Sequence, residues 1–306
     1  MKKLLIVAAA NNTHFLDDIV NALPVELEKR NFQDADVIWL EWADGDCLKL
    51  LLDSFYREKY LRKKKTILRI HRYELFNPSI LNLIGKIDPM VIDHLVFVSH
   101  YVRQIGISHF PWMEKGVVIP NLIDVDKFPF NKDHLPMPGY DLLFLGRISY
   151  VKNLPLMLNM FNELLKIDSN YRLNLVGNIH EPELIYYLDN YIDKAKLTGK
   201  INIHGHIENE LLPDFIKGMS YIVSSSIFES TGIGILEGMA TGLRPVIFNF
   251  PGAEYLFPEQ WLYIDRQKFV DIILRGGMQP KMCREFVLQN YSVQRKIGLY
   301  EELING

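Results

Sequence analysis

The sequence has little of what marks a disulfide-rich, metal-binding, membrane-spanning or nucleic-acid-binding protein. Its two cysteines, Cys47 and Cys283, lie far apart, which excludes a disulfide framework and a four-cysteine zinc site. No apolar run approaches the ~20 residues that cross a bilayer. The formal net charge of −3 gives no electrostatic reason to expect a nucleic acid partner. We therefore expect a cytoplasmic protein.

What the sequence does have is enough chain and apolar residues for two cores. It holds 306 residues, of which 48% are hydrophobic and 23% charged, and domains usually contain about 100–200 residues. Short apolar runs alternate with amphipathic segments, which indicates βαβ units and mostly parallel sheets. The expected strands are residues 3–9, 35–41, 66–70, 94–98 and 116–119 in the first half, and 141–146, 171–176, 201–204, 220–225 and 245–248 in the second.

The prolines and the glycine in 128–141 resist both helix and strand interiors and predict a linker. The fold class is thus α/β, with two Rossmann-like domains facing each other across a cleft. We place the domains at 1–130 and 141–285, the linker at 131–140, and in 286–306 a C-terminal helix that packs back on the first domain. Helices are expected at 46–63, 77–86, 153–166, 181–196, 208–218 and 232–241.

A glycine-bearing stretch, residues 228–240, carries the strongest candidate site. It contains three glycines, and a helix is expected to begin near Gly232 after a strand that ends near Ser225. The first N–H groups of a helix lack partners within it and carry partial positive charge, so a diphosphate is a natural ligand there. Ser230 and Thr231 would add hydroxyl donors.

Two glutamates accompany this helix start. Glu229 precedes it, and Glu237 falls in its second turn among apolar residues. Burying a carboxylate is costly unless something hydrogen-bonds to it, and the two hydroxyls of a ribose would do so. The alternative, in which Glu237 faces water or pairs with a basic side chain, stays open.

Two cations, Arg147 and Lys152, follow the first strand of the second domain. They could neutralise a diphosphate together, and they lie at the same predicted sheet edge as the glycine-bearing helix. A dinucleotide-binding fingerprint over the same glycines is disfavoured. Five residues separate it from the strand, and its last spacing is one residue too long.

Together these motifs resemble the retaining glycosyltransferase family 4, which has the GT-B fold. The resemblance rests on Gly146-Arg147 with Lys152 and on the Glu-Ser-x-Gly-x-x-x-x-Glu motif from Glu229 to Glu237, and it is strong over residues 95–255. It implies a glycosyltransferase whose catalytic residues are Glu229, His71, Arg147 and Lys152. It also implies a donor site formed by Arg147, Lys152, Glu229, Ser230, Thr231, Gly232, Ile233, Glu237, Gly205 and Ile207.

In these implied roles, Arg147 and Lys152 hold the diphosphate, Glu237 binds the ribose, and Glu229 contacts the donor sugar. The nucleobase lies near the segment from His204 to Ile207, which includes Gly205. His71 faces the reacting sugar from the first domain, although a histidine without a role is the alternative. The loop 8–13 departs from the glycine-rich loop of the family, so acceptor contacts cannot be transferred.

The basic cluster 57–65 follows an apolar helical run and has two interpretations. It is either a peripheral contact with the anionic inner face of a membrane, suited to a lipid-linked acceptor, or a solvated helix end.

The expected reaction is transfer of a sugar, with retention, from a nucleotide-diphosphate sugar such as a UDP-sugar to a glycan or lipid-linked acceptor hydroxyl. The nucleotide sugar is a co-substrate, and neither a cofactor nor a metal is expected. A glycoside hydrolase, a non-catalytic nucleotide-sugar-binding protein and a sugar phosphorylase are the alternatives.

Overall fold

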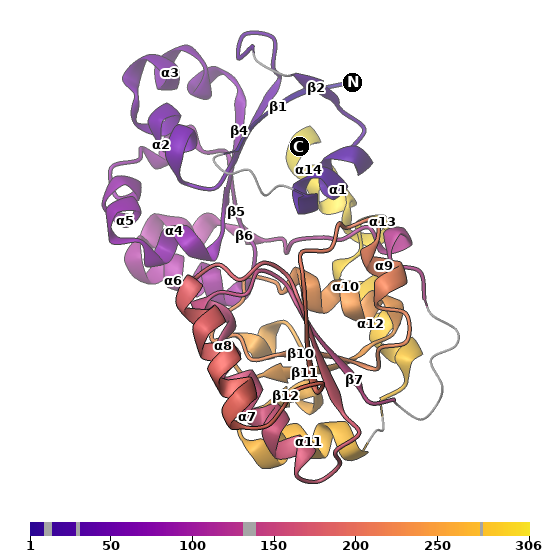
Figure 1. The fold of residues 1–306 in the computed structure, drawn as a ribbon. Helices are drawn as coiled ribbons and strands as arrows, with labels where there is room; N and C mark the ends of the chain where they lie inside the picture. The colour runs from indigo at the N-terminus through magenta and orange to yellow at the C-terminus, as the bar shows by residue number, and fades with distance from the viewer. Residues whose placement is uncertain (9–13, 29–30, 131–138, 276–277) are drawn as a thin grey trace. The chain divides into compact units, whose positions relative to one another are not determined.

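The chain forms two parallel six-stranded sheets, each with helices packed against it (Figure 1). The computed structural model describes residues 1–8, 14–28, 31–130, 139–275 and 278–306. These residues form two units. Unit 1 comprises Met1–Leu122 and Val293–Gly306, and unit 2 comprises Ile123–Ser292.

The sheet of unit 1 has the order β2-β1-β3-β4-β5-β6, and neighbouring strands are parallel. Its strands are β1 (Lys3–Ala8), β2 (Glu26–Glu28), β3 (Val37–Glu41), β4 (Lys65–Ile70), β5 (His94–Phe97) and β6 (Val117–Val118). All five residues of β3 are buried. Strands covered on both faces read as continuous apolar runs, which is why the sequence shows them clearly.

The helices of unit 1 are α1 (His14–Ala22), α2 (Gly45–Leu52), α3 (Ser54–Lys59), α4 (Arg72–Phe76), α5 (Pro78–Ile84), α6 (His100–His109), α13 (Val293–Lys296) and α14 (Gly298–Asn305). The single helix expected over 46–63 is wrong. Asp53 has extended backbone and its carboxylate accepts hydrogen bonds from the N–H groups of Phe55 and Tyr56. This side-chain cap ends α2 and starts α3.

The C-terminal segment divides at Ser292. Helix α12 (Pro280–Tyr291) belongs to unit 2, whereas α13 and α14 belong to unit 1. In unit 1 the Tyr300 ring stacks on Trp39 with centroids 5.1 Å apart, and the Lys2 ammonium donates to the Ile304 carbonyl. The units therefore change at residues 122/123 and 292/293, whereas we placed the domain limits at 130, 141 and 286. Most of the expected linker, 131–138, lies outside the described residues.

The sheet of unit 2 has the order β12-β11-β10-β7-β8-β9, again with parallel neighbours. Its strands are β7 (Asp141–Leu145), β8 (Arg172–Val176), β9 (Ile201–Gly205), β10 (Tyr221–Ser224), β11 (Arg244–Phe248) and β12 (Leu262–Tyr263). The strands predicted from the sequence are all present. The edge strands β2 and β12 were missed because each is too short to show a pattern.

Two apolar cores lie on opposite faces of the unit 2 sheet. One packs helices α7 (Leu154–Leu165), α8 (Pro182–Lys194) and α11 (Arg266–Arg275), and the other packs α9 (Leu212–Phe215), α10 (Ile233–Thr241) and α12. Helix α9 is much shorter than the expected 208–218. Since the strands are parallel, the carboxyl ends of β7, β8, β9 and β10 share one edge, where ligands of such sheets bind.

Candidate functional site

Three glycines close successive strands at the carboxyl edge of unit 2. Gly146, Gly177 and Gly205 follow or end β7, β8 and β9, with φ of 128°, 130° and 69°. The Gly146 N–H donates to the Val176 carbonyl and the Gly177 N–H to the Gly205 carbonyl. A Cβ on Gly177 would lie 2.0 Å from the Gly146 oxygen. The backbones at neighbouring strand ends are thus hydrogen-bonded to each other, and at Gly177 they lie too close together to leave room for a Cβ.

The loop after β7 is held on the loop after β8. The Ile148 N–H donates to the Asn178 carbonyl at 2.9 Å, and the His180 N–H donates to the Ile148 carbonyl at 2.8 Å. Ile148 is fully buried, whereas the preceding Arg147 is exposed. Burying Ile148 therefore fixes the backbone beside Arg147 and leaves its guanidinium in contact with solvent at the strand edge.

Lys152 and Glu229 form an ion pair at this edge. The Nζ–Oε1 distance is 2.6 Å, and the side chains are 22% and 12% exposed. The Lys152 ammonium also lies beside Gly146, since a Cβ built there would be 3.6 Å from Nζ. The hydroxyl of Ser226 donates to the same Glu229 oxygen at 2.6 Å. Glu229 is therefore held between a cation and a buried hydroxyl.

The glycine-bearing helix begins at the same place. Gly232 has left-handed φ of 78° and precedes α10, and a Cβ on Gly234 would lie 2.9 Å from the Leu145 carbonyl at the end of β7. Glycine at position 234 is therefore what lets the helix tip lie against the strand. Thr231 is buried, while Ser230 and Ile233 are half-buried.

Glu237 is only 8% exposed, so the interpretation in which it faces water is wrong. Gly205 and Ile207, the expected nucleobase contacts, are half-buried at the end of β9, and Ile207 packs against the core. Unit 2 thus brings Arg147, Lys152, Glu229 and the tip of α10 to one sheet edge. Their binding roles remain predictions.

His71 lies in unit 1, at the end of β4. Its Nε2 is 2.5 Å from Oε1 of the fully buried Glu41, which also accepts from Arg69 at 2.9 Å. Burial alone would raise the pKa of Glu41, but Arg69 and His71 lower it below the usual value. The ring of Trp42 packs on that of His71 with centroids 5.1 Å apart. His71 is therefore a tightly held side chain in a charged network, which no sequence pattern revealed.

The Glu74 carboxyl is hydrogen-bonded to both of the loops that follow β3 and β4. Its Oε1 accepts from the N–H groups of Ala43 and His71, while its fully buried Oε2 has no hydrogen-bond partner among the residues that the structure describes. Burial raises the pKa of this carboxyl above its usual value. The folded protein therefore retains a proton that the unfolded chain loses above about pH 4.3. Between the unfolded and the folded pKa, stability falls as pH rises.

Glu74→Gln keeps the acceptor oxygen but cannot ionise. We expect the stability of this variant to be closer to that of wild type at pH 4.5 than at pH 8, where the variant should be the more stable of the two. Urea unfolding at the two pH values measures this difference. A stability difference that does not change with pH would contradict a raised pKa of Glu74 in the folded protein.

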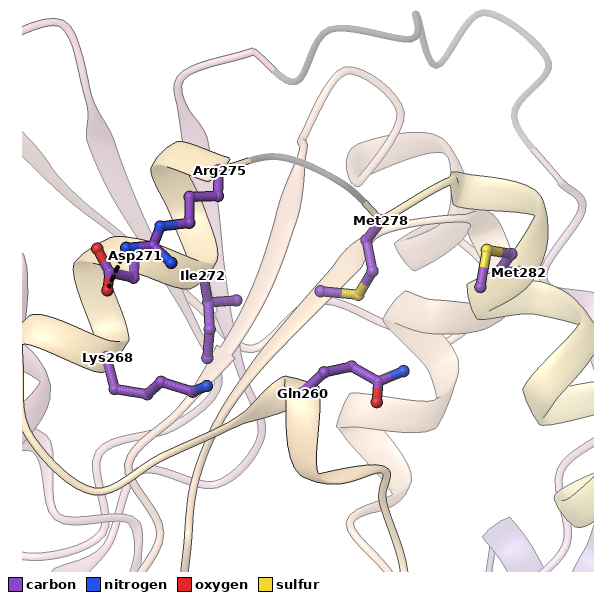
Figure 2. A pocket seen from close by; sticks show the side chains of 7 residues that line it. All are labelled: Gln260, Lys268, Asp271, Ile272, Arg275, Met278 and Met282. Carbon is purple, nitrogen blue, oxygen red and sulfur yellow. Dashed lines mark ion pairs between the residues drawn. The ribbon is translucent and has the colours of Figure 1, made fainter.

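A separate cavity of about 290 Å³ lies between α11 and the start of α12 (Figure 2). It is lined by Gln260, Lys268, Asp271, Ile272, Arg275, Met278 and Met282. Figure 2 shows Arg275 paired with Asp271. The cavity includes none of the predicted site residues, so its position gives no support to the donor site.

Within the described ranges, no group of three His, Cys, Asp or Glu side chains is arranged to hold a metal ion. Metal-independent chemistry remains a prediction. Among the same residues, no helix is both long and apolar enough to span a membrane.

Sequence reasoning missed two serines of the site. Ser226 contacts Glu229, and Ser225 donates to the backbone carbonyl of Lys152 at 2.8 Å. The signal available was a run of three serines, 224–226, at the end of a buried strand. Hydroxyls at a strand end can join neighbouring loops, as these do.

Comparison with known proteins finds sequence similarity in the part of the chain that contains the candidate site. Residues 126–260 match the family model described as Glycosyl transferases group 1. A GDP-mannose:cellobiosyl-diphosphopolyprenol alpha-mannosyltransferase of Xanthomonas oryzae is 28% identical over 156 residues, covering 49% of this chain and 40% of that protein. Mannosylfructose-phosphate synthase of Agrobacterium fabrum is 31% identical over 114 residues, covering 36% of this chain and 25% of that protein. The chain spans less than half the length of these curated relatives.

Solved structures match the whole chain. Anabaena Alr3699/HepE, crystallised with UDP and glucose, has a TM-score of 0.79 at 15% identity and covers 99% of both chains. Sucrose-phosphate synthase from Thermosynechococcus elongatus has a TM-score of 0.74 at 13% identity, covering 98% of this chain and 97% of that one. At such identities the likeness establishes the fold. The α/β GT-B glycosyltransferase fold is confirmed, whereas the narrower assignment to family 4 stays a prediction.

Proposed function

We propose that this chain, which has the GT-B glycosyltransferase fold and matches the group 1 family in its second unit, transfers a sugar from a nucleotide-diphosphate sugar to an acceptor hydroxyl. The observation that carries the proposal is the shared position of Arg147, Lys152 and the α10 tip at the carboxyl edge of unit 2. The exposed guanidinium, the half-buried ammonium and the helix tip offer positive charge to one anionic ligand.

The chemistry of transfer explains why such a site would be useful. When the bond between the anomeric carbon and the diphosphate breaks, negative charge develops on the leaving diphosphate. Lys152 and Arg147 would stabilise that charge more in the transition state than in the ground state, which accelerates the reaction. Glu229 would receive hydroxyls of the donor sugar, and Glu237 those of the ribose.

Lys152 is paired with Glu229 in this structure, and we propose that donor binding exchanges these partners. The diphosphate would take the ammonium, and sugar hydroxyls would replace it at the carboxylate. Because an intact nucleotide sugar supplies both groups, it would replace both halves of the ion pair. A free nucleoside diphosphate supplies only one of them, and would leave the carboxylate without its cation.

The finer features of the proposal are retention at the anomeric carbon and a glycan or lipid-linked acceptor. Peripheral membrane contact through the 57–65 cluster belongs to the same proposal. In that cluster Lys59 and Lys63 are exposed, and the Lys59 ammonium lies 4.9 Å from the centre of the exposed Phe55 ring. Arg62 is partly neutralised by Glu58 and Asp88. The mixture of aromatic and basic side chains supports an interfacial contact.

Thermal-shift screening of the full chain against UDP, GDP, ADP and their sugars tests the donor assignment. A true donor raises the melting temperature with concentration, because it binds only the folded protein. The stabilising nucleotide sugar is then incubated with soluble glycans and with lipid-linked acceptors in anionic vesicles. We expect transfer with an α-linkage from an α-linked donor. Stabilisation by none of the nucleotides would reject the proposal, and rapid release of free sugar without acceptor would favour a hydrolase.

A further inference from the structure

Glu229 is held by two donors that act on the same oxygen. The Lys152 ammonium and the Ser226 hydroxyl each lie 2.6 Å from Oε1. This arrangement leaves the other carboxylate oxygen, Oε2, for hydroxyls of a ligand. The two donors differ in one respect: Lys152 is partly exposed and has a second potential partner in the diphosphate, whereas Ser226 is fully buried.

The direction of the hydrogen bonds around Ser226 follows from the number of donors and acceptors that each group has. An ionised carboxylate only accepts, so the single hydroxyl proton of Ser226 is given to Glu229. The Ser224 hydroxyl, 3.2 Å away, must then donate to the Ser226 oxygen. Ser224 is itself buried, and its carbonyl accepts from the Tyr263 hydroxyl at 3.1 Å. A chain of hydroxyls therefore runs from the end of β10 to Glu229.

The loop that carries this chain is tied to the loop that carries Lys152. The Ile227 N–H donates to the Val151 carbonyl at 2.9 Å, and the Ser225 hydroxyl donates to carbonyls of the segment 152–153. Glu229 is thus positioned relative to Lys152 through backbone contacts that persist when the ion pair itself is broken.

From this geometry we propose that Ser226 is a positioning residue that keeps Glu229 in its sugar-binding orientation once Lys152 has moved to the diphosphate. The inference rests on the proposed function. Ser226 contributes less to the binding of a free nucleoside diphosphate than to transfer, because binding of the diphosphate alone does not need Glu229 to be oriented towards a sugar. It contributes to transfer, because that step needs a correctly oriented Glu229 whose other donor has gone.

The test compares wild type with Ser226→Ala, Glu229→Gln and the double variant. Ser226→Ala is expected to lower kcat by about 10-fold, as loss of a hydrogen bond to a charged group does. Affinity for the nucleoside diphosphate, measured by calorimetry, should fall by clearly less than kcat does, because binding of the diphosphate alone does not need Glu229 to be oriented towards a sugar. In the Glu229→Gln background the serine change should lower kcat by much less.

Ser292→Ala is the matched control. Ser292 is fully buried in unit 2 and its hydroxyl donates to the Leu288 carbonyl, so it reports on the general loss of a buried hydroxyl. Transfer by this variant should equal that of wild type. If Ser226→Ala does not fold, Ser226→Cys takes its place, since a thiol fills similar space and donates weakly. It should then retain reduced transfer.

Three results would overturn the inference. They are unchanged kcat in Ser226→Ala, an equal loss of kcat and of nucleotide affinity, and an undiminished loss in the Glu229→Gln background. Failure of the proposed function looks different, because wild type itself would then neither bind a nucleotide sugar nor transfer from it.

Discussion

Replacing Lys152 with alanine is expected to lower the rate of sugar transfer by about 10²–10³-fold, the usual cost of removing one preorganised group that stabilises developing charge. Lys152 offers the half-buried ammonium of the site, where a charge acts more strongly than it does in water. Its side chain is not part of an apolar core, so the fold should be kept. Steady-state transfer rates, with circular dichroism as a check on folding, measure the effect.

Lys166→Ala is the control for the loss of a lysine. Lys166 pairs with Glu163 at the same 2.6 Å distance but is 61% exposed, at the position that follows the last residue of α7. Its removal should leave transfer unchanged. Arg147→Ala should resemble Lys152→Ala. Full activity in both site variants would end the assignment of the donor site.

The Lys152–Glu229 ion pair leads to a second prediction, in which a substitution increases ligand affinity. Glu229→Gln releases Lys152 from its carboxylate partner, so the affinity for a free nucleoside diphosphate should rise while transfer falls. A titration with the diphosphate alone measures this. Weaker binding by Glu229→Gln would show that the carboxylate does not compete with the ligand for Lys152.

Gly177→Ala is expected to abolish nucleotide binding and to destabilise unit 2. The new Cβ would lie 2.0 Å from the Gly146 oxygen and 2.7 Å from its carbonyl carbon, so the backbone next to Arg147 must move. The φ of 130° adds strain of about 1–3 kcal/mol. At about 2–4 °C per kcal/mol for a domain of this size, the melting temperature should fall by several degrees.

Gly199→Ala separates strain from displacement. Gly199 also has positive φ, 76°, but a Cβ there would meet nothing within 4 Å. This variant should lose a little stability and keep its nucleotide binding. Normal binding by Gly177→Ala would mean that the Gly146–Arg147 turn does not have to stay in place for the ligand.

The fold was predictable from the sequence wherever burial produces a recognisable pattern of apolar residues. Strands such as β3, buried along its whole length, appear as uninterrupted apolar runs. The edge strands β2, with three residues, and β12, with two, are too short to show such a pattern. The break between α2 and α3 was missed although aspartate favours N-cap positions. The return of the chain to unit 1 after Ser292 depends on tertiary packing that no local pattern encodes.

The candidate site was predictable to a similar extent. Its glycines and charged residues occur in motifs, so the residues could be named and their common sheet edge inferred. The partner of Lys152 could not, because Glu229 lies 77 residues further along the chain. The same holds for Glu41, which reaches His71 across 30 residues. Pairings of this kind are fixed by the order of strands in the sheet rather than by spacing in the sequence.

A crystal structure with a bound nucleoside diphosphate is the most direct measurement of whether these groups serve one ligand. We predict diphosphate oxygens within hydrogen-bonding distance of the Lys152 ammonium, the Arg147 guanidinium and the first N–H groups of α10, with the Lys152–Glu229 contact opened. A diphosphate bound away from the ends of β7 and α10, with that ion pair still closed, would contradict the account.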